Sequence, residues 1–492
     1  MNHQNYCKLL GNVAGLLFLL AGGIVLANNV TNRPNVLFLI TDQQCADALS
    51  CRMGTEYLHT PAMDSLAGKG MFFTRAYAAN PLCMPSRNSM FTGRYPHETG
   101  VIHNYGKSWP RLSEAEFPNL GTYFRKAGYE TAYLGKSHLC SKMAESFDTH
   151  VVPKQGEGHD QETLASALKF MQAPHERPFF CVVSFMNPHN VCELARGQIL
   201  PDGPIGAPPP PDQCPPAPVN LAMPENETDS MTILQHANRS SNYGRFIRDY
   251  TTNDWRQFRW SYYRLIEKVD AQIGEVLDAL RKSGQADKTI IVFTSDHGEC
   301  AGAHGFVQKT VLYEEAARVP LIVSVPGRTN PATCDKFVNT GVDIMPTLLD
   351  LAGVPVPEQL PGRSLRPLAL GAQVKTWRDY VVCENDMEGI GKINGLNSAL
   401  EGRMVRTEQF KYCVYNRGEH RESLVDLKND PGETKNLASA PAYHQVLLKS
   451  RALLAKFAKE NNDSLALQML ADDVKPIPFT HETELLSAGK TK

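Results

Sequence analysis

Hydrophobic runs that end in polar residues recur along the chain. Residues 35–40 form a largely apolar run, and Asp42 and Gln43 stand just beyond its end. Runs at 130–134, 179–185 and 289–293 also end in polar and ionisable residues. Such runs are typical of strands that are buried on both faces, as in a parallel sheet. Because ligands of open α/β sheets bind at the carboxyl ends of the strands, we expect these polar residues to converge on one site.

Between these runs lie segments with the apolar spacing of amphipathic helices. They are residues 60–70, 117–128 and 259–284, and the last has the clearest helical period. Helices that alternate with strands indicate an α/β protein with right-handed crossovers.

Two regions depart from this alternation. Residues 190–250 are rich in proline, and a long loop of this kind inside a compact domain is usually functional or disordered. After about residue 367, short strands are expected at 378–383 and 411–415, followed by a last helix at about 440–461. We therefore expect a large domain over residues 33–370 and a smaller C-terminal subdomain over residues 371–480.

The N-terminus has the pattern of an export signal. Lys8 precedes an apolar run at 9–26, and the small residue Ala27 offers a cleavage site. The run is close to the length of a membrane span, so an uncleaved anchor is the alternative. We expect a signal peptide over residues 1–27, and a mature protein that is periplasmic or secreted and has no membrane span.

Composition excludes little beyond nucleic-acid binding. The 492 residues are 42% hydrophobic and 21% charged, with a formal net charge of -2, which is ordinary for a globular protein. No basic excess points to nucleic acid. Of the 12 cysteines, Cys7 lies in the signal and Cys83 in the motif described next. The other ten could form disulfides in an exported protein.

Cys83 stands between two prolines, Pro81 and Pro85. Because each proline removes a donor and restricts the residue before it, we expect a loop at Cys83 that opens onto a helix starting near Ser86. The partial positive charge of a helix N-terminus, with Arg87 one turn away, favours an anion there. The alternative is a cysteine that serves as a small buried apolar residue.

Residues 83–87, followed by Thr92, Gly93 and Arg94, resemble the signature of the sulfatases in the alkaline-phosphatase-like superfamily. The resemblance extends over about residues 35–437. It implies a large α/β domain, with a mostly parallel sheet between helices, and a smaller C-terminal α+β domain with an antiparallel sheet. It also implies that Cys83 is oxidised to Cα-formylglycine by a formylglycine-generating or an anaerobic sulfatase-maturating enzyme.

The resemblance also implies a site for one divalent metal. Asp42 and Gln43 match one pair of family ligands, Asp296 and His297 match the second, and residue 83 completes the set. The family often has Asp-Asp and Asp-Asn at these pairs. Oxygen ligands favour calcium, whereas the imidazole and the fewer carboxylates leave manganese open. Either pair alone could be a cap or turn.

By the same resemblance, several residues have catalytic roles. Arg87, Lys136 and Lys309 match positions that neutralise the sulfate and hold the modified residue. His138 matches the group that takes a proton from the modified residue. His189 matches a residue near the leaving group and is our candidate general acid, either alone or together with Lys309. The implied nucleophile is the formylglycine hydrate. Sulfate is transferred to residue 83, and the second hydroxyl of the hydrate then expels it.

The expected substrate is a sulfated carbohydrate, such as a glycosaminoglycan or other glycan fragment. Its cleft could include His103, Asn104, Lys107 and Trp109, which could equally form a surface loop. One alternative function is that of a phosphonate monoester or phosphate diester hydrolase of the same superfamily. Another is a non-catalytic glycan-binding protein on a sulfatase scaffold.

Overall fold

The four hydrophobic runs form adjacent strands of one sheet in the computed structural model. β1 (Asn35–Asp42) lies between β6 (Phe179–Pro188) and β7 (Thr289–Ser295), and β4 (Glu130–Gly135) pairs with β6. All of these pairings are parallel. Because the strands run in the same direction, their carboxyl ends meet at the same edge, and the expected parallel sheet is confirmed.

The sheet continues with shorter strands on both sides. In the described residues, eight strands follow the order β5-β4-β6-β1-β7-β8-β2-β9. The added strands are β5 (Thr149–Val151), β8 (Leu321–Ser324), β2 (Met71–Phe73) and β9 (Ala332–Cys334). β8 is antiparallel to both of its neighbours, so the sheet is mixed but mostly parallel.

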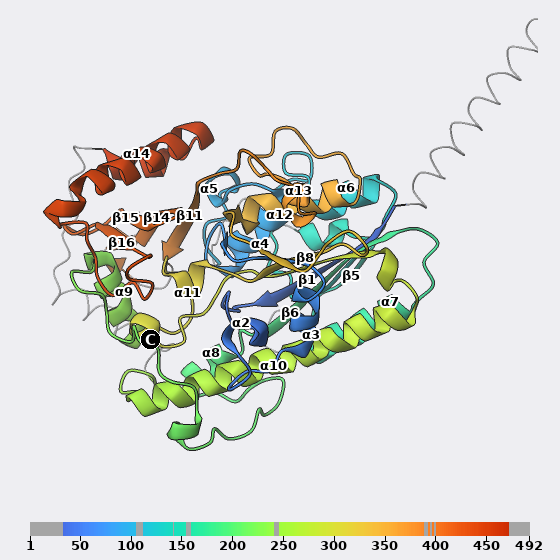
Figure 1. The fold of residues 1–492 in the computed structure, drawn as a ribbon, viewed down its shortest axis with the longest axis horizontal. Coiled ribbons are helices and arrows are strands. Elements are labelled where there is room, and N and C mark those ends of the chain that lie inside the picture. Colours follow the sequence, from blue (N-terminus) through green and yellow to red (C-terminus); the bar gives the residue numbers. More distant parts are fainter. Residues whose placement is uncertain are drawn as a thin grey trace, which may run out of the picture.

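Helices cover both faces of the sheet (Figure 1). One face packs against α3 (Pro61–Ala67), α7 (Asp160–Gln172) and α10 (Thr252–Lys282), and the other against α4 (Cys83–Thr92), α6 (Leu120–Lys126) and α12 (Thr340–Leu351). α10 begins before the expected residue 259 because Thr251 and Asp254 form a capping box.

The helix after Cys83 also begins earlier than expected. α4 starts at Cys83 itself and not near Ser86, so the prediction of a loop at the cysteine is wrong. Pro85 is tolerated because it lies in the first turn, where a backbone N–H has no partner inside the helix. The helix ends at Gly93, whose φ of 67° is a left-handed conformation that glycine adopts easily.

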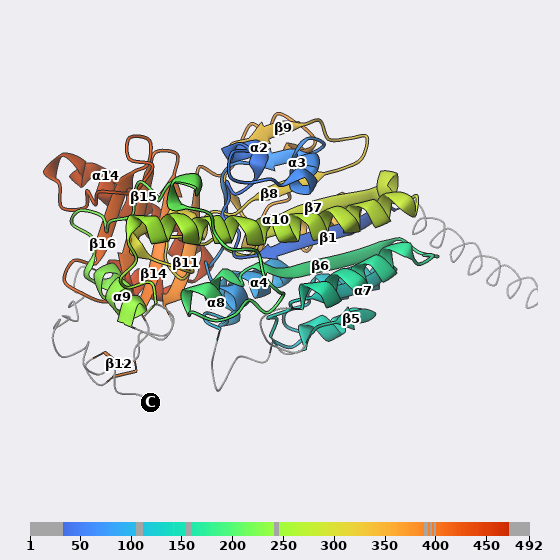
Figure 2. The ribbon, with the colours of Figure 1, turned by 90° about the horizontal axis from the view of Figure 1, so that it is seen from below.

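The C-terminal part forms a second sheet at one end of the molecule (Figure 2). Four antiparallel strands pair in the order β11-β14-β15-β16. They are β11 (Tyr380–Met387), β14 (Leu400–Thr407), β15 (Phe410–Tyr415) and β16 (Glu422–Asp426). The helix expected at about 440–461 is α14 (His444–Asn461), which packs against these strands. It is followed by α15 (Ser464–Leu470), which the sequence did not predict.

The proline-rich region is partly structured. It contains α8 (Val191–Ala195), a 3-10 turn η2 (Pro211–Gln213) and α9 (Asp229–Ser240). Its extended segment lies against α10 (Thr252–Lys282). Gln257 Nε2 of that helix donates to the carbonyl of Pro209 at 3.0 Å, and Arg256 donates to the carbonyl of Cys214 at 2.8 Å. This segment is therefore attached to the long helix.

Short elements complete the chain. They are α2 (Ser50–Met53), β3 (Ala76–Tyr77), α5 (Pro96–Thr99), η1 (Met143–Ser146), η3 (Ala286–Lys288), η4 (Ala303–Gly305), α11 (Glu314–Ala317), β10 (Val338–Asn339), α13 (Arg366–Ala369), β12 (Lys392–Ile393), β13 (Leu396–Asn397) and η5 (Pro441–Tyr443).

The structure describes residues 33–104, 112–140, 142–153, 159–240, 246–387, 392–393, 396–397 and 400–471. The expected signal peptide at 1–27, together with Lys107 and Trp109, lies outside these residues. No helix in the described ranges has the length and hydrophobicity needed to cross a membrane. All eleven described cysteines are free, so the disulfides considered from the sequence do not occur among them.

Candidate active site

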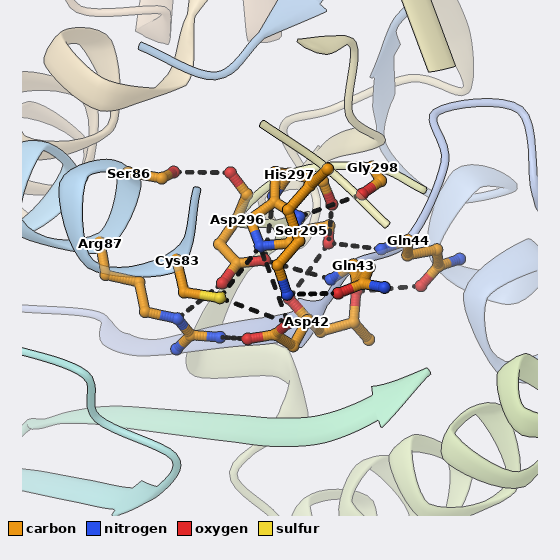
Figure 3. A network of polar contacts seen from close by, with 12 residues as sticks. Asp42, Gln43, Gln44, Cys83, Ser86, Arg87, Ser295, Asp296, His297 and Gly298 are labelled. Atoms are coloured by element: carbon orange, nitrogen blue, oxygen red, sulfur yellow. Dashed lines mark hydrogen bonds and ion pairs between the residues drawn. The ribbon is translucent and has the colours of Figure 1, made fainter. Parts of the chain in front are cut away.

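The thiol of Cys83 lies in a buried cluster of charged side chains (Figure 3). Its Sγ lies 3.2 Å from His297 Nε2, 3.7 Å from Lys136 Nζ and 3.9 Å from Asp42 Oδ1. Asp42 is the last residue of β1, and Asp296 follows the last residue of the adjacent strand β7. The structure thus brings the residues at these strand ends together around the first residue of α4.

Arg87 holds the two carboxylates of this cluster. Its guanidinium is completely buried, with Nε 2.7 Å from Asp296 Oδ2 and Nη2 3.0 Å from Asp42 Oδ2. Nη1 donates to Ser184 Oγ at 2.7 Å and to the carbonyl of Lys136 at 3.2 Å. Charge-assisted bonds of this kind fix geometry as well as neutralise charge. Arg87 therefore contacts chiefly the protein groups that form the site, above all Asp42 and Asp296.

The remaining ligand atoms converge beside the thiol. His297 Nδ1 lies 3.0 Å from the carbonyl of Gly298 and can donate to it, so the neutral imidazole would present the Nε2 lone pair to a metal. Nε2 lies 3.5 Å from Asp296 Oδ1 and 3.8 Å from Asp42 Oδ1. One ligand atom from each of these three residues and from Cys83 lies within 4.8 Å of the others. Two carboxylate oxygens and a correctly oriented imidazole are a donor set that fits a divalent cation.

Gln43 lies at the margin of this cluster. Its backbone has a φ of 71°, and its N–H donates to Asp296 Oδ1 at 3.1 Å. The side-chain Oε1 accepts from Lys309 Nζ at 2.5 Å, while Nε2 donates to the Glu299 carboxylate and, at 3.2 Å, to Cys192 Sγ. The amide oxygen that was predicted as a metal ligand thus contacts an ammonium group, and its role as a ligand stays a prediction.

Two lysines and two histidines surround the other side of the thiol. Lys136 forms a close ion pair with Asp42 and, like Lys309, is less than a tenth exposed. His138 and His189 both interact with Cys83. Their Nδ1 atoms are buried and have no hydrogen-bond partner within the described parts of the chain. All six residues that were predicted to be catalytic therefore lie together.

The electrostatics of this cluster favour an anion at residue 83. Burial alone would raise the pKa of the Cys83 thiol, but the charges of Lys136 and Lys309 hold that pKa well below its usual range. Burial, together with the same lysines, lowers the pKa of His189 to about 3, and burial beside Lys136 lowers the pKa of His138. Both imidazoles are therefore neutral at pH 7 in the free site.

His103 and Asn104 follow the motif helix, as expected, but they differ in their surroundings. Asn104 is buried, and its Oδ1 accepts from the backbone N–H of Met84 at 2.9 Å, in the first turn of α4. His103 is partly exposed and lies 3.8 Å from Asp386 of β11. Asn104 thus stabilises the first turn of α4, and His103 lies beside strand β11 of the C-terminal sheet.

Three residues of the site were not predicted from the sequence. Ser86 Oγ donates to the carbonyl of Asp296 at 2.6 Å, and Ser184 accepts from Arg87. Glu299 is completely buried and contacts Gln43. Of these, only Glu299 has a sequence signal, because an acidic residue two positions after a pair of expected metal ligands is a candidate neighbour of them.

Comparisons with known proteins agree with this geometry. A family model described as sulfatase matches residues 34–354. A second model, described as the C-terminal part of N-sulphoglucosamine sulphohydrolase, matches residues 302–460. Together these matches cover both sheets.

Relatives resemble the chain along most of its length. The Delta 4,5-hexuronate-2-O-sulfatase of Bacteroides thetaiotaomicron is 30% identical over 464 residues, which cover 91% of this chain and 93% of that protein. The solved structure of a 2-O glycosaminoglycan sulfatase matches with a TM-score of 0.77 at 30% identity, covering 88% of this chain and 94% of its own. That of the phosphonate monoester hydrolase of Agrobacterium radiobacter matches with a TM-score of 0.72 at 25% identity, covering 87% and 96%.

Proposed function

This chain belongs to the sulfatase family, and we propose that it removes sulfate from a carbohydrate, with a glycosaminoglycan fragment as the favoured substrate. Family membership makes it a sulfuric ester hydrolase, and the predicted enzyme class is confirmed. The carbohydrate is supported by the likeness to a hexuronate sulfatase over 91% of the chain. The observation that carries the chemistry is the cluster of cationic and imidazole groups around the Cys83 thiol.

Residue 83 acts in this proposal as Cα-formylglycine, produced from Cys83 by a formylglycine-generating or an anaerobic sulfatase-maturating enzyme. When present, the modified side chain supplies the oxygen nucleophile that takes the sulfuryl group from the ester. Its place at the first turn of α4 suits this role, because the partial positive charge of the helix and the nearby lysines stabilise an oxyanion there.

The side chains around residue 83 have different proposed roles. Asp42, Asp296 and His297 would hold a divalent metal, which would withdraw charge from the nucleophile and the sulfate. We favour calcium because carboxylate oxygens dominate the set, with manganese as the alternative. Arg87 balances the carboxylates from the buried side.

Other groups beside the thiol act on the substrate. Lys136 and Lys309, which are each less than a tenth exposed, neutralise the sulfate. His138 is neutral and is suited to accept a proton from residue 83. His189 is the proposed proton donor to the leaving sugar oxygen, a role that it shares with Lys309. Because this imidazole is neutral in the free site, it gains its proton beside the bound sulfate, whose negative charge favours the imidazolium.

The test compares three ester classes with one enzyme preparation whose residue 83 has been confirmed as formylglycine. Sulfate release is measured from a panel of sulfated disaccharides, including an unsaturated 2-O-sulfated uronate, and from an aryl sulfate. A phosphonate monoester is the third class. We expect the highest kcat/KM on one sulfated disaccharide. Turnover of the aryl sulfate without turnover of any sugar would contradict the carbohydrate proposal.

The role of His189 has a separate test. A proton donor matters most for a poor leaving group, such as a sugar hydroxyl, and least for an activated phenol. His189→Ala should therefore reduce kcat far more on the sulfated sugar than on the aryl sulfate. An equal loss on both substrates would contradict the assignment.

The second candidate function is hydrolysis of phosphonate monoesters or phosphate diesters. It is favoured by the structural likeness to a phosphonate monoester hydrolase, which has a TM-score of 0.72. A higher kcat/KM on the phosphonate than on every sulfate ester in the panel would establish it in place of the first.

We also propose that the protein is exported, either periplasmic or secreted, after cleavage behind Ala27. N-terminal sequencing of the protein from its native cells should begin at Asn28. An intact N-terminus would instead indicate an anchored form.

A further inference from the structure

Glu299 is a buried carboxylate beside the site. Its side chain is completely buried and lies two residues beyond His297. Oε1 accepts from the backbone N–H of Ala301 at 2.9 Å and from that of Gln308 at 2.6 Å, and Oε2 accepts from Gln43 Nε2. Three donors thus satisfy one buried charge.

Two of these bonds hold together the two ends of the loop of residues 301–308, which leads to Lys309. We call these two ends the loop base. The loop contains several residues with left-handed backbone, including Ala301 with a φ of 45° and Gln308 with a φ of 74°. Side chains other than glycine adopt this conformation at a cost, so the loop needs an external constraint. The Glu299 carboxylate binds the N–H groups at both ends of the loop, directly before Lys309.

The third bond decides which end of the Gln43 amide faces the site. A carboxylate can only accept and an ammonium can only donate. Because Glu299 takes the Nε2 donor, Oε1 must point to the other side, where Lys309 Nζ donates to it at 2.5 Å. Cys192 Sγ lies 3.2 Å from Nε2 and 3.7 Å from Oε1, and because a thiol can both donate and accept, it is compatible with this orientation without deciding it.

We propose that Glu299 is a positioning residue of the sulfatase reaction. It sets the orientation of the Gln43 amide and, through that amide and the loop base, fixes the Lys309 ammonium beside residue 83. The inference rests on the proposed role of Lys309 at the sulfate and extends the site by a side chain that does not touch the reacting atoms.

The first test is Glu299→Gln. This variant keeps the shape of the side chain and an oxygen for the two loop N–H groups. Its new amide N–H₂, however, faces that of Gln43, so the Gln43 amide must turn and present a donor to Lys309. Loss of a residue that orients catalytic groups typically costs 10–100-fold, and we expect kcat/KM on an aryl sulfate to fall by about that factor. Glu315→Gln, which removes a carboxylate that contacts Asn220 and not Gln43, is the matched control and should stay within about twofold.

The second test exchanges the two groups. In the double variant Gln43→Glu with Glu299→Gln, the amide at 299 donates to the carboxylate at 43, which still accepts from Lys309. The net charge of the pair is unchanged. Gln43→Glu alone places two carboxylates face to face without altering the loop base, so it should also lose activity. The double variant should be more active than either single variant, a coupling that a merely structural role would not produce.

Inorganic sulfate gives a readout without turnover. Sulfate binding to the native state raises the melting temperature, and this shift depends on Lys309 being in place. The shift should shrink in both single variants and return in the double variant. The shift in melting temperature can be measured even if the enzyme hydrolyses none of the esters. Failure of the carbohydrate proposal can therefore be distinguished from failure of the proposal for Glu299.

A Glu299→Gln enzyme with kcat/KM within about twofold of wild type would overturn the proposal. So would a double variant with no more activity and no larger sulfate shift than the weaker single variant. If Glu299→Gln does not fold, Gln43→Glu and the double variant still give the comparison.

Discussion

Two buried clusters in this protein are built from the same kinds of side chain but differ in where their polar groups are directed. One is the active-site cluster of Asp42, Arg87, Asp296 and His297 around Cys83. The other, which we call the junction cluster, comprises His97, Glu384, Arg403 and Asp463. Each combines an arginine, a histidine and two acidic residues, and each brings three acidic or histidine side chains close enough to hold a metal.

In the junction cluster the polar atoms are occupied by one another. His97 Nδ1 lies 2.6 Å from Glu384 Oε1, and Nε2 lies 2.8 Å from the carbonyl of Asn461. Arg403 binds both oxygens of Asp463, at 2.6 and 3.2 Å. Because α5 contributes His97, β11 contributes Glu384 and the end of α14 contributes Asn461, the cluster joins α5 of the large domain to the C-terminal sheet and its helix.

In the active site Arg87 takes only one oxygen of each carboxylate. The second oxygens and His297 Nε2 are directed to a shared position beside the thiol, and two further lysines add positive charge. The comparison teaches that composition alone does not define a reactive site. The reactive cluster directs carboxylate oxygens, an imidazole and lysine ammonium groups at one position beside the thiol, whereas the structural cluster pairs its groups with one another.

The largest expected effect comes from removing the group at the centre of the active site. Cys83→Ala should lower kcat/KM by about 10⁴-fold or more, since no other nucleophile lies in that position. The melting temperature should change by only a few degrees. Steady-state kinetics with thermal unfolding measures both. A Cys83→Ala enzyme that retains a tenth of wild-type activity would contradict the assignment of residue 83 as the nucleophile of the active-site cluster.

The next largest effect concerns metal content, because we expect the active-site cluster to bind a metal and the junction cluster not to bind one. Asp296→Asn should remove the bound metal and reduce kcat/KM by about 10³-fold, because the cation supplies much of the charge stabilisation. Glu384→Gln is the matched variant in the junction and should leave the metal-to-protein ratio unchanged. Elemental analysis after gel filtration gives the ratio. A loss of metal in Glu384→Gln would assign a cation to the junction.

The junction should govern stability instead of activity. Arg403→Met leaves Asp463 buried without its partner, and breaking a buried ion pair costs about 3–5 kcal/mol. Thermal unfolding should show the loss as a lower melting temperature, while kcat/KM of the folded enzyme stays within about twofold. A selective fall in kcat with unchanged stability would place the junction in the catalytic machinery.

The smallest effect is a pH dependence of the junction. Burial alone would lower the pKa of His97, but the hydrogen bond and charge of Glu384 raise this pKa from 6.5 to about 9. A pKa that is raised in the folded state stabilises the protein fully below pH 6.5, and this stabilisation is lost as the pH rises through about 9. It amounts to about 3 kcal/mol.

The difference in melting temperature between wild type and His97→Gln should therefore be largest near pH 6 and should shrink toward pH 10. A difference that grows with pH would show that His97 is neutral in the folded protein.

The sequence predicted the strands and the residues at their ends because both are local patterns. A run such as 35–40 shows its burial in its own composition, and parallel strands bring Asp42 and Asp296 to one edge. The positions of Arg87, Lys136, Lys309 and the two histidines came from a family resemblance, and physical periodicity alone would not have identified them.

The contacts that orient the site could not be predicted, because they join residues far apart in the chain. Arg87 and Asp296 are separated by 209 positions, and Gln43 and Glu299 by 256. Export also suggested disulfides, but buried cysteines such as Cys181 and Cys383 lie in different sheets, where they pack as small apolar residues.

The most direct test of the central claim relates activity to the chemical state of residue 83. Preparations with different extents of modification are digested, and the peptide of residues 76–87 is quantified by mass spectrometry as cysteine or formylglycine. The account predicts that the rate of sulfate release rises in proportion to the formylglycine fraction and extrapolates to zero in its absence. Full activity in a preparation that contains only cysteine at residue 83 would contradict it.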